Sequence, residues 1–217
     1  MARREMDDLI QSGLDRAVEL MTLAAQTSFR FGKRNTCKIV AITKEEIVQL
    51  AEYCFSLGDM APLAARDGRF AMELVKEPSA LLIIADKRQS VFNYNCGACG
   101  YRTCAELNKA EMMESLTSNG PVCIFRNLNL NIAADAAAAM AWRLGLHCRV
   151  FGTLAFAAKA LEVIPEMDLA MSVAVSAAKI DPFFDRHKFW TPEVWDQTFS
   201  KEFPTFTRGF IGANEDE

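Results

Sequence analysis

Apolar residues recur at helical spacing in several segments of the chain. In the first of these, Leu9, Leu14 and Met21 share one face of a helix that is predicted over about 5–26. Thr43-Lys-Glu-Glu46 is a capping-box pattern, in which the Thr and Glu side chains satisfy free amides at a helix start. Further helices are predicted over 43–57, 70–76, 103–116, 131–144 and 153–163.

Short apolar runs between these segments predict extended strands. The run ALLIIA at 80–85 is bounded by Pro78 and Asp86 and is the best candidate for a buried central strand. The other strands are predicted over 36–42, 147–151 and 168–176. Helices that alternate with few short strands favour an α+β fold, an α/β sandwich.

Two stretches carry more apolar surface than a small core needs. The segment 131–144 is nearly all apolar and ends before Gly145, so it is expected to be buried in the core or in a subunit interface. The tail between Phe189 and Phe210 is rich in aromatic residues. We expect it to cover a partner subunit, because so much aromatic area would otherwise face water.

Composition and charge narrow the class of protein. The chain has 217 residues, of which 51% are hydrophobic and 24% charged, so it can bury a real core and is not disordered as a whole. A net charge of -4 without a long basic run argues against nucleic acid or an anionic membrane as the main partner. We find neither a signal peptide nor an apolar run of about 18 residues, which predicts a cytoplasmic protein. Only His147 and His187 are present, which argues against chemistry built on several imidazoles.

Seven cysteines, an odd number, favour metal ligation over a disulfide framework. Cys96, Cys99 and Cys104 form C-x2-C-x4-C, and Cys123 follows after 18 residues. Thiolates suit iron–sulfur clusters or zinc. Iron–sulfur is favoured, because four-thiolate zinc sites usually show two paired C-x2–4-C knuckles and the second pair is missing. A disulfide or an unliganded set is the remaining alternative.

Other candidate groups have simpler interpretations. Cys37, Cys54 and Cys148 lie in predicted strands or on a helix and are expected to be small core residues. The cations of Phe29-Arg-Phe-Gly-Lys-Arg34 either hold a phosphate or belong to a solvated loop. Asp181-Pro-Phe-Phe-Asp185 is expected to form a turn with packed phenylalanines.

The cysteine pattern resembles a known domain. CGACGYRTC with Cys123 is similar to the small four-cysteine [4Fe-4S] domain of the Rnf electron-transport complex and of corrinoid iron–sulfur proteins. The resemblance implies that Cys96, Cys99, Cys104 and Cys123 hold one [4Fe-4S] cluster. The whole chain resembles a ferredoxin-domain family of anaerobic prokaryotes. That resemblance rests on the N-terminal helix, on Asn95-Cys-Gly-Ala-Cys-Gly and on Ile180-Asp-Pro-Phe-Phe-Asp-Arg186.

That family looks like the nitroreductase fold with a cluster segment inserted. It implies one nitroreductase-like domain over 1–217 with the four-cysteine segment inserted at 93–126, and an intertwined homodimer that binds FMN. Flavin phosphate sites need cations near the end of the first helix or in the tail; the candidates are Arg30, Lys33, Arg34, Arg186 and Lys188.

The expected molecule is a cytoplasmic iron–sulfur redox protein of a strict anaerobe. As an oxidoreductase it would pass electrons between the cluster and a flavin or a small organic acceptor, with a redox partner protein as another exchange route. A non-enzymatic electron carrier or redox-sensing adaptor without flavin is the alternative. A zinc-stapled binding protein is the third hypothesis.

Overall fold

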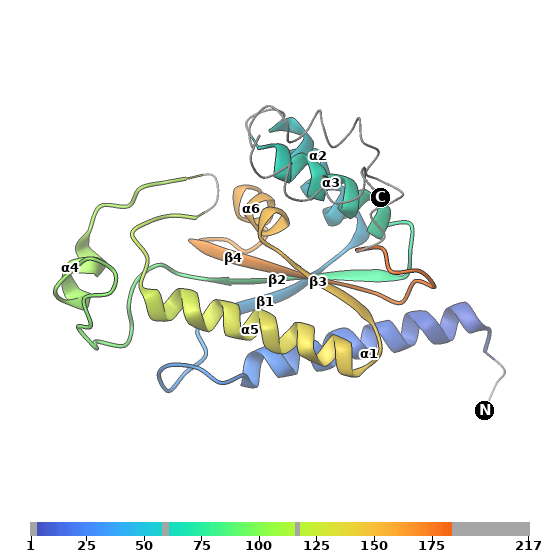
Figure 1. Ribbon diagram of the computed structural model, residues 1–217, viewed down its shortest axis with the longest axis horizontal. Helices are drawn as coiled ribbons and strands as arrows, with labels where there is room; N and C mark the ends of the chain where they lie inside the picture. The colour runs from blue at the N-terminus through green and yellow to red at the C-terminus, as the bar shows by residue number, and fades with distance from the viewer. Residues whose placement is uncertain (1–3, 58–60, 116–117, 184–217) are drawn as a thin grey trace, which may run out of the picture.

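A computed structural model describes residues 4–57, 61–115 and 118–183 (Figure 1). In chain order the elements are α1 (Met6–Thr27), β1 (Lys38–Ile42), α2 (Lys44–Ser56), α3 (Pro62–Leu74), β2 (Ser79–Asp86), α4 (Cys104–Lys109), α5 (Ile124–Arg143), β3 (His147–Phe151), α6 (Gly152–Ala160) and β4 (Leu169–Ser176). The predicted α+β class is confirmed. The predicted strands all form, and the capping box of Thr43 and Glu46 opens α2 as expected.

The strands of the described residues form one antiparallel sheet in the order β1-β2-β4-β3. β2 lies between β1 and β4 and pairs with β4 from Ser79↔Ser176 to Asp86↔Leu169. Leu81 and Ile83 face one side of the sheet, and Leu82 and Ile84 face the other. Because helices cover both sides, β2 is a continuous apolar run, as predicted for a buried central strand.

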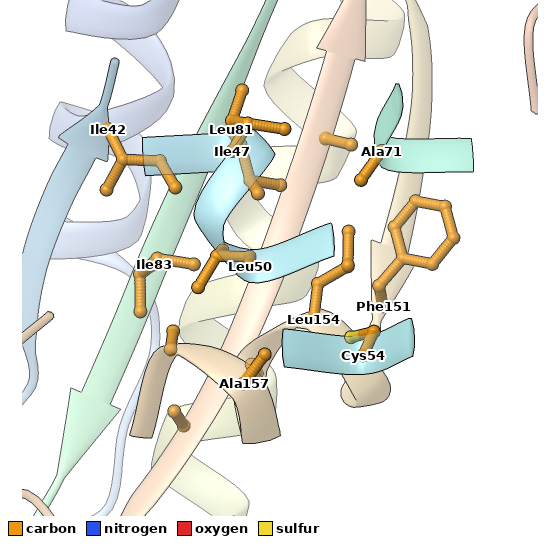
Figure 2. Packing of buried hydrophobic residues seen from close by; sticks show 14 of the residues in the cluster. Ile42, Ile47, Leu50, Cys54, Ala71, Leu81, Ile83, Phe151, Leu154 and Ala157 are labelled. Atoms are coloured by element: carbon orange, nitrogen blue, oxygen red, sulfur yellow. The ribbon is translucent and has the colours of Figure 1, made fainter. Parts of the chain in front are cut away.

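Helices form a layer on each face of the sheet (Figure 1). α2, α3 and α6 cover one face, where Ile47 and Leu50 pack with Leu81, Ile83 and other apolar residues (Figure 2). α1 and α5 cover the other face and pack against Leu82 and Ile84. The result is a three-layer sandwich with a separate apolar cluster on each side of the sheet.

Three predicted helix boundaries are wrong. α3 begins at Pro62 rather than near residue 70, and its inward-facing Asp67 interrupts the apolar pattern. α5 begins at Ile124 rather than at residue 131, because Arg126 and Asn129 face inward in its first turns. The helix predicted over 103–116 is only α4, which ends where Ala110 becomes extended.

One side of α5 is exposed, so this helix is not buried all round within the chain. Trp142 is 77% exposed and Leu128 is 37% exposed, while the opposite side packs on α1 and the sheet. α1 also carries exposed apolar residues, including Leu20 and Leu23. None of the helices in the described ranges is both long and apolar enough to cross a membrane.

Candidate metal centre

The four candidate thiols lie on a long excursion from the sheet. Residues 87–123, here called the cysteine segment, leave the end of β2 and return at the start of α5, and α4 lies at the far side from the sheet (Figure 1). Cys96 is exposed and Cys99 is half-buried on the loop, whereas Cys104 and Cys123 are buried. All four thiols are free of disulfides.

Cys104 is positioned by the start of α4 and by the loop before Cys96. Thr103 and Glu106 form a capping box that fixes the first turn of α4. The backbone N–H of Asn95 donates to Cys104 Sγ at 3.4 Å, and Asn95 Oδ1 accepts the backbone N–H of Cys104 at 2.9 Å. A hydrogen bond from Ser90, with bonds from the amides of residues 93–95, lowers the pKa of Cys104 against the opposing effect of burial. These hydrogen bonds stabilise the charged form of the sulfur more than the neutral thiol.

Cys123 is the residue that precedes α5. Its backbone N–H donates to the carbonyl of Arg88 at 2.9 Å, and its own carbonyl accepts the amides of Arg126 and Asn127. Its sulfur makes no capping hydrogen bond, so it stays available as a ligand. Ser90 contacts the sulfur of Cys104, and the carbonyl of Arg88 accepts the backbone amide of Cys123, so residues 88–90 contact both buried cysteines.

Backbone geometry around Cys96 and Cys99 is of the left-handed kind. Gly97 and Gly100 have φ of 75° and 86°, in the left-handed region that glycine adopts at little cost. Asn93 and Asn95 also have positive φ, at 55° and 49°. The amides of residues 93–95 donate to the Cys104 sulfur, so this loop supplies N–H donors that suit an anionic group.

Sequence reasoning missed Ser90 and Asn95 as contacts of a candidate ligand. Asn is, with Asp and His, the residue type that most readily joins Gly in the left-handed region, so two asparagines beside the first cysteine were an available signal. Ser90 offered none, because only the folded chain brings it to Cys104. Asn108 of α4 then fixes Ser90 through both its amide and its carbonyl.

The chemistry of the donor set suits a soft metal centre, because thiolates are the ligands of an iron–sulfur core. Across the ranges that the structure describes, no three His, Cys, Asp or Glu side chains gather as they would around one metal ion, so the four candidate thiols are not brought together in that arrangement. Four free thiols, two of them buried and one hydrogen-bonded at sulfur, are the donors that such a core requires.

A buried ion pair joins the base of the cysteine segment to the sheet. Arg126 of α5 donates to Asp86 at the end of β2, and both side chains are at least nine-tenths buried. Thr36 Oγ1 donates to the same carboxylate at 2.8 Å, and Arg126 Nε donates to the carbonyl of Gln89 at 2.8 Å. The charge of Arg126 is therefore balanced by a carboxylate.

The loop that holds three of the predicted flavin cations packs against the cysteine segment. Asn129 of α5 bonds both the amide and the carbonyl of Phe31. The rings of Phe31 and Phe125 lie 4.7 Å apart, and Phe125 also meets Tyr94 at 5.2 Å. Within this loop Gly32 lies so close to Phe92 that an added Cβ would be 2.6 Å from its ring.

These cations differ in their roles. Arg30 donates to the carbonyls of Gln26 and Ser28 and so caps the end of α1. Lys33 and Arg34 are exposed on the same loop. Arg186 and Lys188, like Asp185, His187 and the aromatic tail, lie outside the described residues.

A cavity of about 320 Å³ lies beside the cysteine segment. Ala98, between Cys96 and Cys99, lines it together with Val122 and Ile124, which flank Cys123. Residues 169–171 of β4 form another wall, at a place where β3 has already ended. None of the lining side chains is charged, so the cavity suits an uncharged molecule.

The remaining cysteines are in apolar surroundings. Burial raises the pKa of Cys148 to about 12 and that of Cys54 to about 11. Burial and the nearby carboxylate of Asp86 raise the pKa of the half-buried Cys37 to about 12. The structure thus places them as core residues, as predicted. His147 lies 3.4 Å from Asp181, which also accepts the amide of Phe183 in the expected turn.

The fold is a small α+β sandwich, and its cysteine segment carries four free cysteines. Residues 119–186 match the family described as "Uncharacterized protein containing a ferredoxin domain (DUF2148)", a match that includes Cys123 but not the first three cysteines of the site. A relative from Archaeoglobus fulgidus, itself described as "Uncharacterized protein", is 31% identical over 179 residues, or 82% of this chain and 95% of the relative. The chain belongs to this ferredoxin-domain family, and membership indicates an iron–sulfur electron-transfer protein.

Proposed function

We propose that Cys96, Cys99, Cys104 and Cys123 hold one [4Fe-4S] cluster, and that the protein is an oxidoreductase. The observation that carries this proposal is the environment of Cys104, whose sulfur accepts an N–H bond from Asn95 and contacts Ser90. When bound, the cluster would supply single-electron transfer. The residues of the chain fix its ligands, donate hydrogen bonds to sulfur and keep water from the two buried thiols.

The cavity beside the cysteine segment gives a small organic acceptor a place to approach. Ala98, Val122 and Ile124 line the cavity, and each of them is next in the sequence to a candidate ligand. Its lack of charged side chains favours an uncharged acceptor. FMN would instead place its phosphate near Arg30, Lys33 and Arg34, with Arg186 and Lys188 completing the proposed set.

We also propose that the chain is a homodimer of nitroreductase type, with one domain over 1–217 and an inserted cluster segment at 93–126. Exposed apolar residues on α1 and α5, among them Leu23 and Trp142, support an interface there. The second candidate function is an electron carrier or redox-sensing adaptor without flavin. It is favoured by Arg30, whose Nη1 already donates to the carbonyls of Gln26 and Ser28 at the end of α1.

One anaerobic purification tests these proposals. The absorption spectrum is recorded, iron, sulfide, zinc and extracted flavin are assayed, and the mass in solution is measured by light scattering. Iron and sulfide with flavin support the oxidoreductase, and iron and sulfide alone support the carrier. Zinc alone would overturn the redox function, and a monomeric mass would overturn the dimer.

A further inference from the structure

Arg88 ties together the two ends of the cysteine segment from a buried position. The residue is 5% exposed and follows β2 directly after Lys87. Its guanidinium donates to the carbonyl of Ala110 at 2.9 Å and to that of Pro121 at 3.4 Å. Its own carbonyl accepts the amide of Cys123 at 2.9 Å. Arg88 therefore contacts the last candidate ligand through its backbone and the chain just before that ligand through its side chain.

The charge of Arg88 has no carboxylate partner in contact. In the described parts of the chain, buried Arg126 is paired with Asp86, but no acidic side chain lies within ion-pair distance of the Arg88 guanidinium. Asp168 is near, but its oxygens accept the backbone amide of Arg88 and the side-chain amide of Asn119. In addition, Arg88 Nε is buried and has no hydrogen-bond partner within the described ranges. Burial of an unpaired cation with an unused donor is costly unless an anion completes the site.

We propose that Arg88 is the charge partner of the anionic cluster, an inference that rests on the proposed [4Fe-4S] centre. A core held by four thiolates is a net anion and becomes more negative when it gains an electron. A buried cation beside it stabilises the reduced form more than the oxidised form, because the interaction is strong where solvent screens little. Arg88 is thus a positioning residue that holds the carbonyls of Ala110 and Pro121 and raises the midpoint potential of the cluster.

Redox titration followed by electron paramagnetic resonance tests this role on the full-length, cluster-loaded protein. Arg88→Gln removes the charge and Arg88→Lys keeps it, while Arg102→Gln removes an exposed charge from the same segment as a matched control. For Arg88→Gln we expect the equilibrium to shift at least tenfold toward the oxidised cluster, which is about 59 mV for a one-electron couple. Arg88→Lys and Arg102→Gln should each change this equilibrium by less than about threefold. Arg88→Lys keeps the buried charge, and Arg102→Gln removes only an exposed charge that solvent and salt screen.

A shift in Arg88→Gln no larger than that in Arg102→Gln would overturn the proposal, as would an equal shift in Arg88→Lys. If Arg88→Gln does not retain iron, its redox titration is replaced by pulsed electron paramagnetic resonance on wild-type protein grown with ¹⁵N-arginine. We expect a ¹⁵N coupling to the reduced cluster that is lost in Arg88→Lys, and absence of the coupling contradicts the role. A wild-type protein without iron and sulfide refutes the proposed function instead, so the two failures are distinguishable.

Discussion

The cysteines of the chain divide into two regions with opposite chemistry. In the cysteine segment, hydrogen bonds to sulfur lower the pKa of Cys104. In the sheet and its helices, burial raises the pKa of Cys54 to about 11 and that of Cys148 to about 12. Cys54 lies in the apolar cluster with Phe151 and Leu154 (Figure 2). All of these cysteines carry the same thiol group, and its surroundings decide whether the thiol or the thiolate is the stable form.

This difference shows that burial alone does not identify a cysteine that can bind a metal centre. Cys104 and Cys148 are 9% and 8% exposed, so their accessibility is nearly equal. They differ in their surroundings: the loop before Cys96 supplies N–H and O–H donors to Cys104, whereas Cys148 lies in the apolar cluster between the sheet and the layer of α1 and α5. A sequence shows the spacing of cysteines but not the donors that face them.

The largest expected effect is loss of the cluster when a segment cysteine is replaced. Cys104→Ser and Cys99→Ser should lose most of their visible absorption, iron and sulfide, because a serine oxygen is a poor ligand for an iron–sulfur core. Cys54→Ala is the matched control and should keep its colour. Far-UV circular dichroism checks that each variant is folded. Unchanged colour in a folded Cys104→Ser protein would count against the ligand assignment.

A second effect concerns the ion pair that joins the two regions. Asp86→Asn leaves the buried guanidinium of Arg126 without a counter-charge and should lower the free energy of unfolding by about 3–5 kcal/mol. Glu19→Gln breaks the exposed pair with Arg16 and should cost less than about 1 kcal/mol. Urea denaturation of both variants measures the difference. Equal losses would show that the buried pair is not needed to attach the segment.

A third effect tests the contact between the cation loop and the cysteine segment. Gly32 has φ of 84°, and a Cβ there would meet the Phe92 ring at 2.6 and 2.8 Å. Gly32→Ala should therefore lower the free energy of unfolding by about 1–3 kcal/mol. Gly13→Ala, in α1 with nothing within 4 Å, should raise it by roughly 0.5–1 kcal/mol. The prediction fails if both substitutions stabilise the protein in urea denaturation.

The smallest effect is a pH dependence that arises from a core thiol. Between pH 9.0 and about 12 the unfolded chain releases the Cys148 proton while the folded chain keeps it, so the free energy of unfolding falls as pH rises. Cys148→Ala lacks this loss. From about pH 8 to about pH 10, the free energy of unfolding of the wild type should therefore fall by about 1.4 kcal/mol relative to that of the variant. A constant difference, measured by urea denaturation, would mean that the folded thiol titrates normally.

Much of the fold was predictable because its signals are local. The run at 80–85 indicated a central strand, and Thr43 with Glu46 indicated the start of α2. The boundaries of α3 and α5 were wrong where polar residues face inward. Asp67 accepts a hydrogen bond from Thr153, 86 residues away, and Arg126 reaches Asp86, 40 residues away. Such partners lie outside any local window, so the apolar pattern could not account for them.

By itself, the sequence determined the class of the fold, the spacing of the four cysteines and the positions of the strands, because each depends on residues a few places apart. Only the tertiary structure decided which groups surround those cysteines. It brought Ser90 and Asn95 to one sulfur, and it packed the loop of Phe31 against α5 through Asn129, 98 residues away. It also placed the Arg88 guanidinium in the interior with no ion-pair partner among the described residues. The physical reason is that hydrogen bonding and charge compensation depend on distance in space, which separation along the chain does not fix.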